Sequence, residues 1–91
     1  MSGATMDTGF VHDHMGKLVH MANQIGDFFE SQEASQRVPG IAEHIGQFWD
    51  KRMRRDIYAH VAAGGAGLHP TVIEAVKLVQ SQDKAFNRSQ P

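Results

Sequence analysis

The sequence contains no cysteine among its 91 residues. This absence excludes disulfide bonds and metal sites with thiolate ligands. The chain also lacks any long run of apolar residues, so we expect neither a membrane-spanning helix nor a signal peptide, and we expect a cytoplasmic location. A chain of this length buries only about 60–65% of its unfolded surface on folding. Its core is therefore small, and such a core often gains apolar area from a partner.

The net charge of −1 conceals an uneven distribution of charge along the chain. Residues 1–49 include two basic and six acidic residues, a net charge of −4. Residues 50–91 include seven basic and four acidic residues, a net charge of +3. This polarity favours docking on a partner of mixed charge over binding to nucleic acid, which requires an extended basic face.

Apolar residues recur at helical spacing along most of the chain, without strand-like alternation of useful length. The pattern predicts an all-α fold, a small bundle of about four helices, with a single domain over residues 12–80. A flexible N-terminal arm over residues 1–11 precedes this domain, and a polar tail over residues 81–91 follows it.

The first predicted helix begins near Asp13 or His14, with Asp13 as its N-cap. Its apolar stripe consists of Leu18, Ala22, Ile25 and Phe29. Met21 and Phe28 on one flank and Val19 on the other widen this stripe to roughly half of the helix circumference, whereas about 100° is enough to face one core. We therefore expect this helix to contact a second surface besides its own core.

The second and third predicted helices meet at a sharp corner. A polar loop over residues 31–39 leads into the second helix, which begins at Pro39 or Gly40 because proline is favoured in a first helical turn. Asp50 is predicted as the N-cap of the third helix, which leaves almost no room for a connecting loop. Phe48 and Trp49 therefore lie at the corner between the two helices.

A glycine-rich segment over residues 64–67 ends the third helix, because glycine adopts the left-handed cap conformation at no steric cost. The segment is not predicted to bind phosphate, because it lacks the preceding strand and the lysine that phosphate loops require. Pro70 opens the fourth helix at its first position. After Gln80 the sequence turns polar, and we expect the helix to fray there.

Residues 48–55 contain the only tryptophan and four of the nine basic residues. Helical projection places Arg52 and Arg55 on the outer face of the third helix and Arg54 on its apolar side. We hypothesise that Arg54 pairs with a carboxylate of a partner and that Trp49 anchors the same interface, because bidentate arginine pairs and aromatic anchors are typical of interface hot spots. The alternative is a solvated helix face with one partly buried arginine.

Other kinds of chemistry have weaker support in the sequence. The six histidines are scattered, whereas zinc sites require four ligands at closed spacing. No nucleophile–base pair or paired carboxylate is recognisable, so we do not expect an enzyme with its own active site. The basic cluster could belong to a DNA-recognition helix, but Asp50 and Asp56 flank the cluster and the rest of the chain offers no phosphate-binding surface.

Taken together, these residues resemble the delta subunit of cytoplasmic NAD-dependent, molybdenum-containing formate dehydrogenases. The resemblance extends from about Leu18 to Val76, roughly two thirds of the chain. It rests on the order and spacing of Met21-Ala22-Asn23-Gln24-Ile25, Ile41-Ala42-Glu43-His44-Ile45, Phe48-Trp49-Asp50, Arg52-Met53-Arg54, His60, Gly64-Gly65, Gly67-Leu68 and Pro70. The family tends to have proline where this chain has Lys51, so the start of the third helix depends on Asp50 alone.

The resemblance implies membership of a complex. In that family a large alpha subunit holds the bis-guanine-dinucleotide molybdenum cofactor and oxidises formate, and iron–sulfur clusters carry the electrons to a flavin (FMN) subunit that reduces NAD. The implied role of the delta subunit is to bind the catalytic alpha subunit, in a complex with beta and gamma subunits. It would either stabilise the assembly or assist maturation with cofactor. A free-standing helical adaptor or regulator that binds another protein or DNA is the alternative.

No cofactor, metal or catalytic residue is expected in this chain, and neither nucleic acid nor a membrane is an expected partner. The residues expected to bind the partner subunit are Met21, Asn23, Gln24, Phe28, Phe48, Trp49, Asp50, Arg52, Met53, Arg54, Gly65, Gly67 and Leu68.

Overall fold

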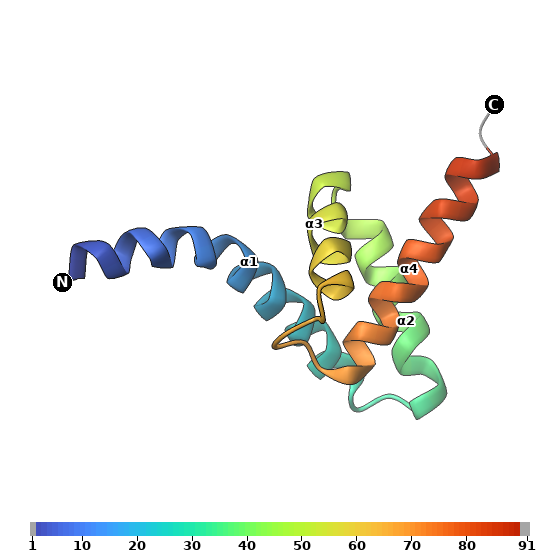
Figure 1. The fold of residues 1–91 in the computed structure, drawn as a ribbon. Helices are drawn as coiled ribbons and strands as arrows, with labels where there is room; N and C mark the ends of the chain where they lie inside the picture. Colours follow the sequence, from blue (N-terminus) through green and yellow to red (C-terminus); the bar gives the residue numbers. More distant parts are fainter. Residues whose placement is uncertain (1, 90–91) are drawn as a thin grey trace.

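The computed structural model describes the backbone of residues 2–89 and the side chains of residues 14–84. Within this range the chain forms four helices and no strand, which confirms the predicted all-α fold (Figure 1). The helices are α1 (Ser2–Phe29), α2 (Ala34–Phe48), α3 (Lys51–Ala62) and α4 (Pro70–Ser89). Over the described residues, no helix combines the length and the apolar character that crossing a membrane requires.

The helices pack around the α2–α4 pair, which makes the most extensive contact in the molecule, and α1 and α3 lie against it. In Figure 1 the first half of α1 extends away from the other helices. The flexibility expected for residues 1–11 stays a prediction. The buried apolar side chains come from all four helices and from the connections around α3: Leu18, Ala22, Ile41, Ala42, Ile45, Trp49, Ile57, Leu68, Val72, Ala75, Val76 and Val79. Full burial of one isoleucine or valine side chain stabilises the folded state by about 1.5–3 kcal/mol. The stability of this core therefore depends on a few side chains.

Two helices begin earlier than the sequence pattern predicted. α1 starts at Ser2 and not near Asp13, because no proline interrupts the preceding residues and an established helix propagates readily. α2 starts at Ala34 and includes Pro39, which was expected to open it. Pro39 lies in the second turn and is exposed. It has no N–H to donate to the carbonyl of Ser35, and its ring crowds the same carbonyl.

The fourth helix is longer than predicted. α4 begins at Pro70, as expected, but it continues to Ser89 instead of ending after Gln80. Within this extension Asp83 contacts two side chains of α3, Arg54 and Tyr58. These contacts hold α4 against α3 beyond the predicted end of the domain, and the last residues of the predicted polar tail, 90–91, lie outside the described residues.

The corner between α2 and α3 forms as predicted. The Trp49 backbone is extended and its N–H donates to the carbonyl of Ile45 at 3.0 Å, which ends α2. Asp50 then caps α3, because its Oδ1 accepts a hydrogen bond from the backbone N–H of Met53 at 2.8 Å. Such a side-chain cap is worth about 1 kcal/mol. Two adjacent residues therefore end one helix and begin the next.

The connection from α3 to α4 is a tight turn at the predicted glycines. Gly65 has a φ of +66°, and its N–H donates to the carbonyl of His60 at 2.9 Å. An added Cβ at this position would lie 3.0 Å from Ile73 Cδ1, so both the backbone conformation and the packing favour glycine. His60 Nε2 lies 2.7 Å from the carbonyl oxygen of Ala66, and the helix thereby holds the loop that follows it.

Candidate partner-binding surface

Three large apolar side chains on α1 and α2 are exposed to solvent. Met21 is 38% exposed, Phe28 69% and Phe48 68%. Next to them lies a hollow of about 490 Å³, which is lined by Met21, Gln24, Ile25, Phe28, His44 and Trp49. We call these six residues together with Phe48 the α1–α2 apolar surface. Exposed apolar clusters on a small protein commonly mark interaction sites.

The contribution of α1 to this surface follows from helical spacing. Residues 21, 24, 25 and 28 are related as i, i+3, i+4 and i+7, so they form one stripe along the helix. The buried stripe of α1 includes Leu18 and Ala22, with Ile25 and Phe29 packed partly against the core. The two stripes adjoin at Ile25, which packs on the core and also lines the hollow. The surplus apolar width noted in the sequence therefore lies at the surface.

The contribution of α2 comes from its last turns and the corner that follows. His44 and Phe48 are one turn apart, and their ring centroids are 4.7 Å apart at an interplanar angle of 38°. Trp49 is only 4% exposed, so its ring belongs to the core while it also lines the hollow. The prediction that Trp49 lies at the corner is confirmed, but most of its surface is already covered within the chain.

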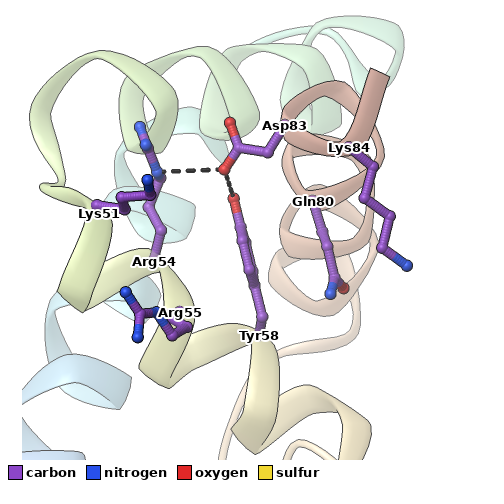
Figure 2. A pocket seen from close by; sticks show the side chains of 7 residues that line it. All are labelled: Lys51, Arg54, Arg55, Tyr58, Gln80, Asp83 and Lys84. Carbon is purple, nitrogen blue, oxygen red and sulfur yellow. Dashed lines mark hydrogen bonds and ion pairs between the residues drawn. The ribbon is translucent and has the colours of Figure 1, made fainter. Parts of the chain in front are cut away.

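Arg54 makes two polar contacts inside the subunit. Its Nη1 donates to the carbonyl of Gly46 at 3.1 Å, and its Nε lies 3.3 Å from Asp83 Oδ2 (Figure 2). The Nε is buried and not aligned for a hydrogen bond, so this second contact is an ion pair. The side chain is partly buried at 21% exposure, as predicted, and the carboxylate it pairs with here is that of Asp83 on α4. A carboxylate from a partner stays a prediction.

The carbonyl that Arg54 binds belongs to the last turn of α2. The last four carbonyls of a helix lack partners within the helix, and Gly46 is one of these in α2. A cation at this end also interacts favourably with the helix dipole. Arg54 therefore caps α2 from the neighbouring helix and connects it to α4 through Asp83. Its position on the apolar side of α3 is explained by the fold.

Tyr58 lies one turn after Arg54 on α3 and contacts the same carboxylate, that of Asp83. Its hydroxyl donates a hydrogen bond to Asp83 Oδ2 at 2.5 Å (Figure 2). Burial raises the pKa of Tyr58 above its ordinary value of 10.0, and the hydrogen bond and the negative charge of Asp83 raise the pKa further, whereas Arg54 lowers it. Tyr58 therefore stays protonated as a donor at any physiological pH.

Several residues predicted to bind a partner have roles within the fold, and their contact with a partner stays a prediction. Asn23 connects α1 to the loop before α4, since its Nδ2 donates to the carbonyl of Gly67 at 2.9 Å and its Oδ1 accepts from the N–H of His69 at 3.1 Å. Leu68 is 7% exposed and belongs to the core. The others in this group are Asp50, which caps α3, Met53, which packs partly on the core, and Gly65, which is buried in its turn.

The structure brings together five of the predicted contact residues, and these belong to the α1–α2 apolar surface: Met21, Gln24, Phe28, Phe48 and Trp49. Arg52 is exposed on α3 and outside this surface. Two residues that contribute to the surface were not predicted, Ile25 and His44. Their spacing was the available signal, because Ile25 is four residues after Met21 and His44 is four residues before Phe48.

The histidines show no sign of a metal site in the part of the chain whose side chains are described. His14 Nε2 lies 3.0 Å from Asp56 Oδ2 and connects α1 to α3. Among these described residues no three histidine, cysteine or acidic side chains are grouped so that they could hold a metal ion.

The described part of the chain is thus a small all-α domain that exposes apolar side chains on one surface. The chain belongs to the NADH-dependent formate dehydrogenase delta subunit family (FdsD), whose model matches residues 17–76. This range confirms the resemblance seen in the sequence, and it contains every residue of the α1–α2 apolar surface. No curated protein and no solved structure gives a match.

We expect the Tyr58 hydroxyl to stay protonated far into the alkaline range. Because Tyr58 is the only tyrosine, phenolate absorbance reports this side chain alone. At pH 11 a tyrosine with a pKa of about 10 is about 90% ionised, whereas the folded protein should show little phenolate. The stability that comes from the raised pKa is complete below pH 10 and is lost as the pH rises further, so ionisation should coincide with alkaline unfolding.

Asp83→Asn is the control for this titration, because removal of the negative charge should lower the pKa of Tyr58. Circular dichroism at each pH separates ionisation in the folded state from unfolding. Half-ionisation near pH 10 in a protein whose circular dichroism is unchanged would contradict the assigned contact.

Replacement of Arg54 should weaken the fold itself. Arg54→Met leaves the carbonyl of Gly46 and the Asp83 carboxylate without their partner, so we expect the free energy of unfolding to fall by about 1–3 kcal/mol. Arg52→Met on the exposed face of the same helix should change it by less than about 0.5 kcal/mol. Urea denaturation measures both. Equal stability of the two variants would show that Arg54 does not hold α2 and α4 against α3.

Proposed function

We propose that this chain is a non-catalytic accessory subunit that binds the large catalytic alpha subunit of a cytoplasmic NAD-dependent, molybdenum-containing formate dehydrogenase. The observation that carries the proposal is the α1–α2 apolar surface, where Phe28 and Phe48 are each about two thirds exposed. The surface lies within the segment that defines the family. The family match supports membership of a formate dehydrogenase complex. The exposed aromatic side chains support the α1–α2 apolar surface as the site of contact.

The composition of the surface favours a protein partner. Five of its seven residues are apolar or aromatic, and Gln24 and His44 provide the polar groups. Protein interfaces have a core that is enriched in aromatic residues and methionine, and both kinds are present here. Contact with the alpha subunit would cover Phe28 and Phe48 and extend the small core of this chain onto its partner.

The redox cofactors are proposed to lie in the partner subunits. Iron–sulfur clusters are held mainly by cysteine thiolates, and this sequence has no cysteine. By the resemblance, the molybdenum cofactor belongs to the alpha subunit, while iron–sulfur clusters and FMN serve electron transfer to NAD. This chain would support the assembly, with beta and gamma subunits in the same complex.

Two accessory roles use the same surface. A stabilising subunit stays bound and slows dissociation of the finished complex, whereas a maturation factor binds the alpha subunit before or during insertion of the cofactor. Molybdenum content and formate oxidation, measured in complexes that were assembled without this chain and then supplied with it, distinguish the two. If this chain is a stabilising subunit, its addition to the finished complex restores the stability of the complex. If it is a maturation factor, its addition at that stage does not restore the molybdenum content.

We expect Phe28→Ser and Phe48→Ser to release the partner. Each change removes an aromatic anchor, and truncation of such an anchor typically costs about 2 kcal/mol or more of binding free energy. The measurement is recovery of the large molybdenum-containing subunit with the tagged chain from its native source. Both phenylalanines are mostly exposed, so the variants should fold, and circular dichroism checks this.

Ala59→Ser is the matched control, because Ala59 is an exposed helical position on α3 outside the surface. It should retain the partner as the unmodified chain does. Equal recovery with Phe28→Ser, Phe48→Ser and Ala59→Ser would refute this surface as the site of contact. Recovery of no molybdenum protein by the unmodified chain would refute the complex itself and favour a free-standing adaptor.

A further inference from the structure

A second recess, of about 370 Å³, lies between α3 and α4 (Figure 2). Its lining includes Lys51, Arg54, Arg55 and Tyr58 from α3, and Asp83 and Lys84 from α4. We call this recess the basic groove. It is distinct from the α1–α2 apolar surface, and neither the proposed function nor the family match assigns a role to it.

The groove carries an excess of positive charge. Arg54 and Asp83 pair with each other, and Asp83 is the only carboxylate among the described side chains that line the groove. Lys51, Arg55 and Lys84 therefore contribute three positive charges that the lining does not neutralise. All three are exposed and come from both walls of the groove. Such a concentration of one charge sign attracts a ligand of the opposite sign.

Asp83 influences which anion the groove favours. Its carboxylate repels a phosphate dianion about twice as strongly as a single carboxylate at the same distance, although Arg54 offsets part of that charge. Its Oδ2 already accepts from Tyr58 and faces Arg54, so its other oxygen is the one that can accept an N–H. A peptide supplies backbone N–H donors beside its carboxylates, whereas free phosphate and a nucleic-acid backbone do not. The arginine and lysine side chains can pair with carboxylates.

The groove and the proposed interface both include a residue of the α2–α3 corner. Trp49 lines the apolar hollow and Lys51 lines the basic groove. Their Cα atoms are separated by two peptide units and so by at most about 7.6 Å. One protein surface that covers the hollow can therefore continue into the groove around the α2–α3 corner.

We propose that the basic groove binds an acidic peptide segment of the partner protein, through carboxylates that pair with Lys51, Arg55 and Lys84. This assignment rests on the proposed function, because the segment belongs to the protein that covers the α1–α2 apolar surface. The apolar surface supplies the anchors, and the groove recognises charge and fixes the orientation of the partner.

A labelled hexaglutamate peptide is the probe, and its binding to the full chain is measured by fluorescence anisotropy at low salt. The groove variant, Arg55→Gln/Lys84→Gln, removes one cation from each wall of the groove. The control variant, Arg52→Gln/Lys77→Gln, removes two exposed cations from the same two helices outside the groove. Both variants lose the same charge. An exposed ion pair is worth up to about fivefold in affinity, so the groove variant should bind at least about threefold more weakly than the control variant.

Equal binding by the two variants would overturn the proposal, as would tighter binding of inorganic phosphate or of a thymidine oligonucleotide of the same charge. Self-association of the unmodified chain that the groove variant abolishes would also overturn it, because the occupant would then be a second copy. Within the complex, the groove variant should retain the partner at low salt and release it at lower salt concentrations than the control does. If both variants release it alike while Phe28→Ser abolishes binding, the groove proposal fails and the proposed function stands.

Discussion

Arg54 connects three of the four helices through one side chain. It projects from α3, binds the carbonyl of Gly46 at the end of α2, and pairs with Asp83 on α4. These contacts satisfy one carbonyl at the end of α2 that lacks a partner within its helix, and they connect the helices on both sides of the corner that contains Trp49. Next to this corner the last turn of α2 exposes Phe48, and α3 and α4 form the walls of the basic groove. Both proposed binding sites depend on these contacts of Arg54.

The small size of the chain explains why its surface is apolar in one place. With four helices and few fully buried side chains, the domain cannot enclose both stripes of α1. Leu18 and Ala22 are covered, while Met21 and Phe28 remain at the surface. A partner that covers this second stripe would enlarge the core of the subunit, so binding and folding stability are coupled.

Local features of the fold were predictable from the sequence, and contacts between distant residues were not. Helical periodicity, the Asp50 cap, the glycines after α3 and Pro70 each act over a few residues, and each was predicted correctly. Asp83 is 29 residues from Arg54 and Asn23 is 44 residues from Gly67, and nothing in the spacing of one helix indicates such pairs. Arg54 was therefore correctly placed on the apolar side of α3, but its pairing with Asp83 was not predicted.

The proposed function requires that the large catalytic subunit covers the α1–α2 apolar surface. Site-specific photo-crosslinking in the assembled complex tests it most directly, with the photoreactive amino acid placed at position 28, at position 48 or at the control position 59. If this subunit covers the surface, positions 28 and 48 crosslink to the large molybdenum-containing subunit and position 59 does not. Crosslinks from position 59 alone, or crosslinks from position 28 only to other proteins, would contradict it.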